Sequence, residues 1–380
     1  MISTTRMLRL HPQDNIAVAL VDLAAGEASS DAGPILVQSV KQGHKFAVLP
    51  IPAGQNVLRY GQIIGQATCD IACGEHVHVH NLGMGEHTRD YAYARDAKAL
   101  DPAGEARTFD GYHRADGTVG TRNYLGILTS VNCSGSVAKF IAEAAEKSGF
   151  LDDYPNIDGI VPISHSTGCG MSGDNEGYAT LHRTLAGYAQ HPNFGGILLI
   201  GLGCEVMQIS ALVGGRPIRA DGALRYMTIQ HEGGTRKTIK KGLQELRGIA
   251  ELANQTARKP APVSHLMVGM QCGGSDGYSG ITANPALGAA SDLLVRHGGT
   301  TILSETSEIY GAEHLLTRRA VTEDVGKKLI DRVRWWEDYT ARNDGEMDNN
   351  PSPGNKRGGL TTILEKSLGA VAKSGSAPLS

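Results

Sequence analysis

The sequence predicts an α/β protein with a small β-rich module at its N-terminus and a mostly parallel α/β region after it. Short apolar runs separated by glycine and proline fill residues 1–82. From Phe109 onward, apolar runs of strand length alternate with amphipathic stretches of helix length, which is typical of β-α units. Four of the strand-like runs end near a cysteine, which indicates that equivalent strand ends lie along one edge of a sheet.

The N-terminal module is expected to contain strands at residues 15–23, 44–49 and 63–67, with turns at Gly26 and Gly54. Residues 83–108 alternate opposite charges and lack apolar periodicity. They predict a solvated linker between the module and the rest of the chain.

Three histidines alternate with valines where the module ends: His76, His78 and His80. Alternate side chains of a strand share a face and lie roughly 6.6 Å apart, at a rise of ~3.3 Å per residue. Histidine is the commonest metal ligand, so the triplet predicts metal binding or direct contact with a substrate. The alternative is a surface strand with ordinary polar alternation.

The α/β region is expected to divide at the proline-punctuated residues 257–262 into a lobe at 109–257 and a second lobe at 258–380. Ser136 is the predicted N-cap of the first helix. The predicted strands are residues 125–131, 159–163, 196–200, 224–230, 266–270 and 300–303, and the predicted helices are residues 137–147, 179–190, 238–254, 286–297 and 322–342.

Four cysteines follow predicted strands at regular intervals: Cys133, Cys169, Cys204 and Cys272. The intervals (169 − 133 = 36, 204 − 169 = 35, 272 − 204 = 68) correspond to about one, one and two β-α units. Because the carboxyl ends of parallel strands meet at the edge where ligands bind, we expect the thiols to share a metal site there. The alternative for each cysteine is an inert buried thiol.

Other motifs suggest groups for acid–base chemistry and ligand binding. His165 precedes Cys169 by four residues on the same predicted turn and is the best lone acid–base candidate, with a structural histidine as the alternative. The glycine-rich stretch after Cys272 lets the backbone approach a ligand closely. The loop at residues 350–360 presents Lys356 as an anion-binding loop would, or is a plain surface loop.

Composition excludes several classes of protein. The formal net charge is −3 without a long basic run, which disfavours nucleic-acid binding. The N-terminus lacks a signal peptide, and no apolar stretch approaches the ~20 residues of a membrane span. We expect a cytoplasmic protein whose 6 cysteines stay reduced, and a homo-oligomer, most simply a dimer.

Together these motifs resemble the altronate/galactarate dehydratase family of sugar-acid hydro-lyases. The resemblance is carried by residues 43–47, 74–81, 116–123, 201–205, 271–285 and 350–356. It implies an N-terminal SAF-type module, an α/β catalytic region, and loss of water from an aldonate or aldarate to give a 2-keto-3-deoxy acid. It also implies a divalent metal, with Fe²⁺ favoured over Mn²⁺.

The resemblance leaves the substrate open, because the histidine triplet is like the altronate branch whereas S-E-T-S-E at residues 304–308 is more like the galactarate branch. Members of the family continue past the equivalent of Ser380, so we expect this chain to be truncated at its C-terminus.

On this basis we expect His76 and His78 to bind the metal, with Cys133, Cys169, Cys204 and Cys272 around it. His165 would act as acid or base, and Lys356 and Arg122 would hold the carboxylate. The expected substrate-binding residues are His80, Gly273, Gly274, Ser275, Asp276 and Asn355. The alternatives are a sulfolactate-type sulfo-lyase, a non-catalytic sugar-acid binding protein and a redox iron–sulfur protein.

Overall fold

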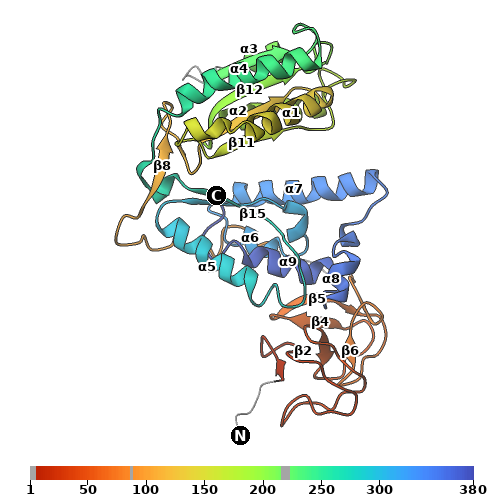
Figure 1. The fold of residues 1–380 in the computed structure, drawn as a ribbon. Helices are drawn as coiled ribbons and strands as arrows, with labels where there is room; N and C mark the ends of the chain where they lie inside the picture. The colour runs from red at the N-terminus through yellow and green to blue at the C-terminus, as the bar shows by residue number, and fades with distance from the viewer. Residues whose placement is uncertain (1–5, 86–88, 215–222) are drawn as a thin grey trace. The chain divides into compact units, whose positions relative to one another are not determined.

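The computed structural model describes residues 6–85, 89–214 and 223–380 (Figure 1). The chain forms two compact units, here called the first and the second unit. The first unit combines residues 1–105 with residues 266–380, and the second unit consists of residues 106–265. The protein is thus a mixed α/β structure in which the second unit is inserted between two halves of the first.

The N-terminal part of the first unit is β-rich, as predicted. One antiparallel sheet has the order β1-β2-β3-β6 and another has the order β4-β5-β7. Every predicted strand of the module overlaps an observed strand. The strands are β1 (Met7–Leu8), β2 (Ile16–Ala19), β3 (Lys45–Ala47), β4 (Asn56–Arg59), β5 (Gln62–Ala67), β6 (His76–Val77) and β7 (Leu82–Gly83).

The β module shares a hydrophobic core with the C-terminal part of the chain. Val57, Ile64 and Val77 pack in one cluster with Ile309 and Leu368. Helix α9 (Ile363–Ala372) is buried along nearly its whole length, because it lies within this core. The module is therefore fixed to the C-terminal segment rather than free to move as a separate domain.

The predicted solvated linker is also anchored within the first unit. The amide of Ala94 donates to the carbonyl of Thr317 at 3.0 Å, and the Tyr91 hydroxyl donates to Glu313 at 3.2 Å. Thr317 Oγ1 donates in turn to the carbonyl of Tyr91 at 2.7 Å. These bonds hold the connector against helix α6 (His314–Thr317).

The remaining elements of the first unit confirm the predicted helices and strands after residue 265. Strands β15 (Met267–Met270) and β16 (Thr300–Leu303) form a parallel pair. The other elements are α5 (Ala283–Arg296), α7 (Glu323–Arg342), α8 (Pro353–Arg357) and the short 3-10 turns η4 (Thr306–Ile309) and η5 (Met347–Asn349).

The second unit contains a four-stranded parallel sheet of order β11-β10-β12-β13. Alternate residues of its central strands face opposite sides: Ile127 packs with helices α1 and α4, whereas Leu128 packs with α2 and α3. The elements are β10 (Tyr124–Thr129), η1 (Asn132–Ser134), α1 (Gly135–Lys147), η2 (Phe150–Asp153), β11 (Gly159–Ile163), α2 (Glu176–Gln190), β12 (Phe194–Gly201), α3 (Ile209–Gly214), β13 (Leu224–Thr228), α4 (Thr235–Ala253) and η3 (Val263–His265).

Three strands of the second unit were not predicted. They form an antiparallel sheet of order β14-β8-β9 from β8 (Thr108–His113), β9 (Val119–Gly120) and β14 (Lys259–Pro262). The proline-rich segment at residues 257–262 is therefore largely a strand, which proline tolerates at a sheet edge. The last four residues of this segment pair with β8.

Two sequence predictions are wrong. Ser136 does not cap α1, because the helix already begins at Gly135 and its N-cap is Ser134. The four cysteine-bearing strands do not belong to a single sheet: β10, β11 and β12 lie together in the second unit, whereas β15, which precedes Cys272, pairs with β16 in the first unit.

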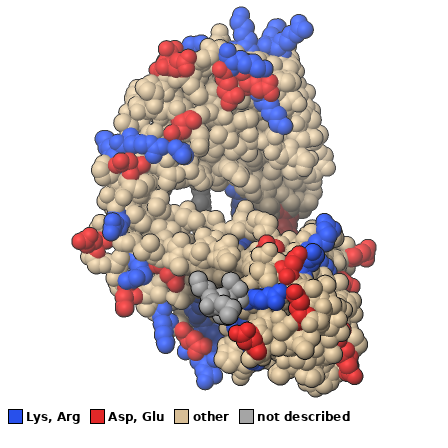
Figure 2. Space-filling model, turned by 60° about the horizontal axis from the view of Figure 1, so that its bottom comes forward, with Lys and Arg blue, Asp and Glu red and all other residues tan. Residues whose placement is uncertain are grey.

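Among the described helices, none combines the length and apolar character that crossing a membrane requires. On the face drawn in Figure 2, lysines and arginines are interspersed with aspartates and glutamates instead of forming one basic surface.

Candidate active site

The predicted histidine strand is shorter than expected. Strand β6 ends at Val77, and a turn follows in which the Asn81 side chain accepts from the amide of His78 at 2.9 Å and donates to the carbonyl of His76 at 3.0 Å. Val79 is consequently exposed. The turn still keeps the histidines together, since the rings of His76 and His80 lie 5.6 Å apart.

A fourth histidine joins this group. The ring of His44, which lies next to β3, is 5.2 Å from the rings of both His76 and His78, and those two rings are 5.3 Å apart. The sequence argument missed His44 because it lies 32 residues before His76. The pairing of β3 with β6 brings the two positions together.

Hydrogen bonds fix the protonation of these rings. His44 Nε2 lies 3.0 Å from the carbonyl of Arg357, and His78 Nε2 lies 2.8 Å from the carbonyl of Lys356. A carbonyl only accepts, so both Nε2 atoms carry the hydrogen. In this tautomer His44 accepts at Nδ1 from His76 Nε2, 3.0 Å away. Within the described residues, this leaves the Nδ1 lone pairs of His76 and His78 without a partner.

The surroundings keep the two rings neutral. Burial, together with the neighbouring imidazoles, lowers the pKa of His76 to about 3. Burial also lowers the pKa of His78, against the hydrogen bond to the Lys356 carbonyl, which raises it. A neutral imidazole with an open nitrogen is the form that binds a metal ion.

Three glycine-containing loops meet beside the histidines. The amide of Gly277 donates to the carbonyl of Gly358 at 2.7 Å. A β-carbon on Gly277 would lie 2.0 Å from the carbonyl oxygen of Gly43, and one on Gly359 would lie 2.5 Å from the same oxygen. Only glycine allows this approach of three backbones. The loop at residues 271–277 and the loop at residues 350–359, both predicted as ligand-binding, are therefore adjacent.

A buried ion cluster supports the loops from behind. Glu365 accepts from Lys45 Nζ at 2.9 Å and from Arg59, and all three side chains are at most 1% exposed. Lys45 also donates to the carbonyl of Gly359 at 2.8 Å, and Arg59 donates to that of Gly277 at 2.6 Å. Burial raises the pKa of Glu365, but the charges of Lys45 and Arg59 outweigh burial and hold it at about 2.

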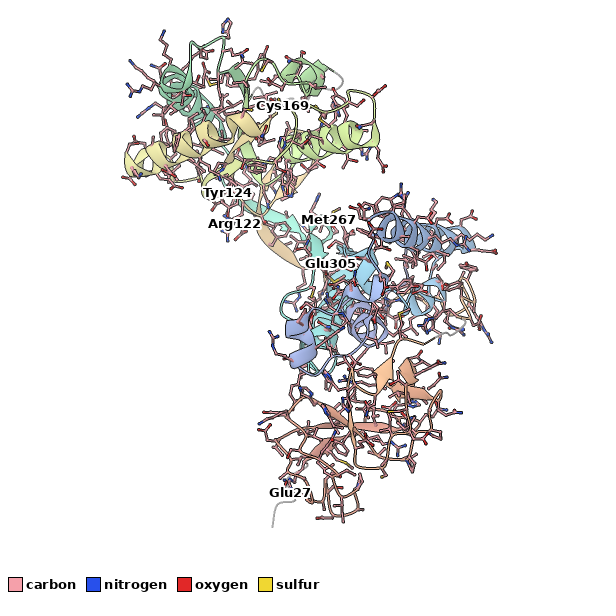
Figure 3. All side chains as sticks on the ribbon, turned by 90° about the vertical axis from the view of Figure 1, so that its right-hand side faces the viewer. Glu27, Arg122, Tyr124, Cys169, Met267 and Glu305 are labelled. Atoms are coloured by element: carbon pink, nitrogen blue, oxygen red, sulfur yellow. The ribbon has the colours of Figure 1, made fainter. Side chains whose placement is uncertain are left out.

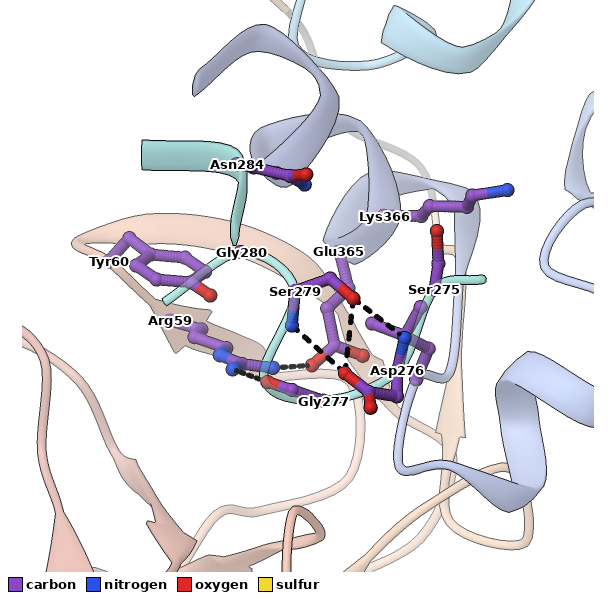
Figure 4. A pocket seen from close by; sticks show the side chains of 12 residues that line it. Arg59, Tyr60, Ser275, Asp276, Gly277, Ser279, Gly280, Asn284, Glu365 and Lys366 are labelled. Atoms are coloured by element: carbon purple, nitrogen blue, oxygen red, sulfur yellow. Dashed lines mark hydrogen bonds and ion pairs between the residues drawn. The ribbon is translucent and has the colours of Figure 1, made fainter. Parts of the chain in front are cut away.

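A small polar cavity lies next to the ion cluster (Figure 4). Ser275 and Asp276, two of the predicted substrate-binding residues, line it. The other lining residues were not predicted: Arg59, Tyr60, Gly277, Ser279, Gly280, Asn284, Leu360, Glu365, Lys366 and Gly369. Gly277, Ser279, Gly280 and Asn284 belong to the motif at residues 271–285, whereas no local motif identifies Arg59 of β4 or the residues of α9.

The other predicted residues of the first unit lie on the same loops. The Asn355 side chain donates to the carbonyl of Ser275 at 2.8 Å and thereby joins the two loops. Lys356 lies in α8, and its carbonyl accepts from His78. No atom lies within 4 Å of a β-carbon built on Gly273 or Gly274, so space beside their backbones is open. Cys272 lies on this loop, and its sulfur is 3.0 Å from Ser275 Oγ.

The predicted residues of the second unit occupy two ends of its sheet. Cys133, Cys169 and Cys204 follow the carboxyl ends of β10, β11 and β12, whereas Arg122 precedes the amino end of β10 and pairs loosely with Asp158 at 3.7 Å. Figure 3 shows Arg122 and Cys169 at opposite ends of the unit. Arg122 therefore does not lie beside these thiols.

His165 has a structural role in this conformation. Its Nε2 donates to the carbonyl of Thr129 at 3.0 Å, and its Nδ1 accepts from the amide of Thr167 at 3.3 Å. Both ring nitrogens are thus used by the backbone. This geometry therefore favours a structural role for His165 over a role as acid or base.

The histidine cluster supplies fewer ligands than a complete metal site needs. Within the described part of the chain, no three histidine, cysteine, aspartate or glutamate side chains are placed to hold one ion. The open nitrogens of His76 and His78 could serve as two ligands, and a chelating ligand would then have to fill the other coordination positions. A hydroxy acid supplies such oxygen atoms.

Comparison with known proteins agrees with this organisation. Three family models match: the SAF domain of altronate/galactarate dehydratases at residues 5–85, the second domain of D-galactarate dehydratase/altronate hydrolase at residues 111–254, and the C-terminal domain of D-galactarate/altronate dehydratases at residues 263–380.

Relatives of similar organisation are enzymes. Altronate dehydratase of Escherichia coli (strain K12) is 40% identical over 97% of this chain and 74% of its own length. Galactarate dehydratase (L-threo-forming) of the same organism is 40% identical over 98% of this chain and 73% of its own length. The (2R)-sulfolactate sulfo-lyase subunit beta of Chromohalobacter salexigens is 34% identical over 71% of this chain and 66% of its own length. The named dehydratases are hydro-lyases, so this chain is an enzyme of the lyase class and belongs to the altronate/galactarate dehydratase family.

Proposed function

We propose that the chain removes water from an aldonate or aldarate and releases a 2-keto-3-deoxy acid, with a divalent metal bound by His76 and His78. The observation that carries this proposal is the pair of open Nδ1 lone pairs on neutral imidazoles beside the three glycine loops. Fe²⁺ is among the ions that imidazole ligands suit, and Mn²⁺, which suits oxygen ligands of the substrate, is the second choice.

The ion would act as a Lewis acid that stabilises the negative charge which develops when the C2 proton leaves. The carboxylate and 2-hydroxyl of the substrate would supply the remaining ligands. The chain's own groups would do the rest. Lys356 would pair with the carboxylate. The exposed His80, 5.6 Å from the ring of His76, would contact a hydroxyl of the substrate.

The loops would position the substrate. The amide groups around Gly273 and Gly274 lie beside open space and would approach the substrate without a steric barrier. The hydrogen bonds of His44 and His78 to the carbonyls of residues 356 and 357 would orient the imidazoles. Such outer contacts fix the tautomer of a ligating histidine.

The direct test is a screen of hexonates and hexarates with an assay for 2-keto acids, after anaerobic addition of Fe²⁺ or Mn²⁺. We expect one stereochemical class of substrate to turn over, and we expect the double variant His76→Ala, His78→Ala to lose this activity while keeping its circular dichroism spectrum. The matched control is His231→Ala, which removes a histidine that is 84% exposed. Full activity in the double variant would refute the assigned role.

A sulfo-lyase activity is the second candidate, because the sulfolactate sulfo-lyase subunit beta is also a relative. It would release sulfite from (2R)-sulfolactate. Sulfite release when (2R)-sulfolactate is added as a substrate, without any 2-keto acid from hexonates or hexarates, would favour this candidate over dehydration.

A further inference from the structure

A second cavity of the first unit lies apart from the candidate active site. It encloses about 720 Å³ including its open mouth, which is within the size range of small-molecule pockets. The connector after β7, the segment between η4 and α6, and single residues of α7 and α9 line it. Among the described residues, this cavity and the small cavity beside the ion cluster share no lining residue, and α9 contributes Leu364 to one and Glu365 to the other.

Arg89 brings a positive charge to this cavity without a counter-ion. Its Nη2 is buried and has no hydrogen-bond partner, and among the residues that the structure describes no carboxylate forms an ion pair with its guanidinium. Burial lowers the pKa of Arg89, because the charged group loses hydration there. A charge that is largely removed from water and unpaired is unfavourable unless a ligand supplies the missing contacts.

The backbone makes room for this guanidinium. Gly311 has a φ of 88°, a conformation that suits glycine. A β-carbon at this position would lie 2.8 Å from Arg89 Nη2 and 2.2 Å from Leu364 Cδ2. Both side chains therefore reach the wall of the cavity because position 311 is a glycine.

The acidic side chains of the cavity are engaged by tyrosines instead of by Arg89. Glu313 accepts from the Tyr91 hydroxyl at 3.2 Å and from the amide of Gly311, and Glu337 accepts from the Tyr310 hydroxyl at 3.1 Å. Burial and the adjacent carboxylates raise the pKa of both tyrosines to about 12, so the hydroxyls keep their protons at neutral pH. Each hydroxyl oxygen and each carboxylate still has lone pairs that can accept a hydrogen bond.

The lining thus combines one planar cation with a set of hydrogen-bond acceptors. A guanidinium binds a carboxylate through two parallel hydrogen bonds, and the hydroxyl groups of a ligand supply donors for the acceptors. We propose that this cavity binds a small hydroxy acid, with its carboxylate at Arg89 and its hydroxyls at the Tyr91–Glu313 and Tyr310–Glu337 pairs. Sugar acids belong to this class, so the site would hold a second molecule of substrate or product, a consequence that rests on the proposed function.

Isothermal titration calorimetry on the full chain tests the site without turnover. The protein carries His76→Ala and His78→Ala and is kept in EDTA, which removes metal-dependent binding at the candidate active site. We expect one molecule of gluconate or galactarate to bind per chain. Adding Arg89→Met should weaken this binding at least about tenfold. The matched control Arg342→Met alters an exposed arginine at the end of α7, outside the cavity lining, and should leave the affinity unchanged.

Two partial ligands test the chemistry of the lining. Sorbitol has hydroxyls without a carboxylate, acetate has a carboxylate without hydroxyls, and each should bind at least about tenfold more weakly than gluconate. The urea midpoint of Arg89→Met should not fall, because the guanidinium has no partner among the described residues of the protein.

The proposal is overturned if neither gluconate nor galactarate binds, if Arg89→Met leaves the affinity unchanged, or if alanine binds more tightly, since its ammonium group would then pair with the carboxylates. A lower urea midpoint in Arg89→Met would also overturn it, because Arg89 would then be held by the protein itself. Dehydration that persists in the double variant His76→Ala, His78→Ala refutes the proposed function and leaves this site untouched, so the two failures are distinguishable.

Discussion

Replacing Glu365 by glutamine tests whether the buried ion cluster holds the candidate active site together. The substitution keeps the size of the side chain and removes the charge that compensates Lys45 and Arg59. All three side chains are at most 1% exposed, so the two cations remain buried without a counter-ion. Removing one member of such a cluster costs about 3–5 kcal/mol.

The pKa of Glu365 gives a similar magnitude. It is about 2 in the folded protein, against an ordinary value of 4.5. At about 1.4 kcal/mol per pH unit, this difference corresponds to about 3 kcal/mol of folding free energy. Because the folded pKa is the lower one, this stabilisation is complete above pH 4.5 and is lost as the pH falls towards 2.

Urea denaturation followed by tryptophan fluorescence measures this effect in the relevant unit, because both tryptophans, Trp335 and Trp336, lie on α7 of the first unit. We expect Glu365→Gln to lower the free energy of unfolding by about 3 kcal/mol at pH 7 and by roughly half as much at pH 3. The control Glu323→Gln breaks an exposed pair with Lys327 and should give no measurable change.

The reasoning is refuted if Glu365→Gln costs less than about 1 kcal/mol at pH 7, the range of an exposed pair. It is also refuted by a cost that does not change between pH 7 and pH 3, since the effect would then not arise from the charge of the carboxylate.

Three further predictions concern the loops, the second unit and the substrate. Gly277→Ala places a β-carbon 2.0 Å from the Gly43 carbonyl oxygen and should lower the unfolding free energy of the first unit by about 1–3 kcal/mol. The control Gly273→Ala, with open space around it, should change this free energy by less than about 0.5 kcal/mol. Equal effects of the two variants would contradict the close approach of the backbones. Asn123→Ala removes hydrogen bonds to the carbonyls of Asn156 at 2.8 Å and Ala253 at 3.0 Å. It should lower the free energy of unfolding by about 1–3 kcal/mol, measured by circular dichroism in urea. An unchanged free energy of unfolding would argue against this network. Lys356→Met should raise the KM for the sugar acid about tenfold or more while the fold stays intact, and an unchanged KM would exclude contact with the carboxylate.

Local patterns predicted the elements of the fold well. The alternation of apolar runs and amphipathic stretches identified the helices α1, α2, α4, α5 and α7 and the strands of both parallel sheets. This works because a strand or a helix places side chains with a fixed period that neighbouring residues alone reveal. The short strands β8, β9 and β14 escaped prediction, since glycine and proline interrupt their patterns.

The candidate site was only partly predictable. His76 and His78 stand out because they alternate within a few residues, and the glycine loops at residues 271–277 and 350–359 are visible as motifs. His44 lies in the motif at residues 43–47, but nothing local connects it with the histidine triplet, and Arg59 and Glu365 carry no local signal. They become part of the site through pairing of β3 with β6 and through burial of α9 against the β module.

The sequence by itself determined the class of the protein, the order of its main helices and parallel strands, and the loops of the candidate site. Only the tertiary structure decided that Cys272 belongs to a different sheet from the other three thiols, that His165 is held by the backbone, and that Gly43, Gly277 and Gly359 touch. The reason is that period and turn chemistry act between neighbouring residues, whereas these outcomes depend on contacts between segments that are distant along the chain.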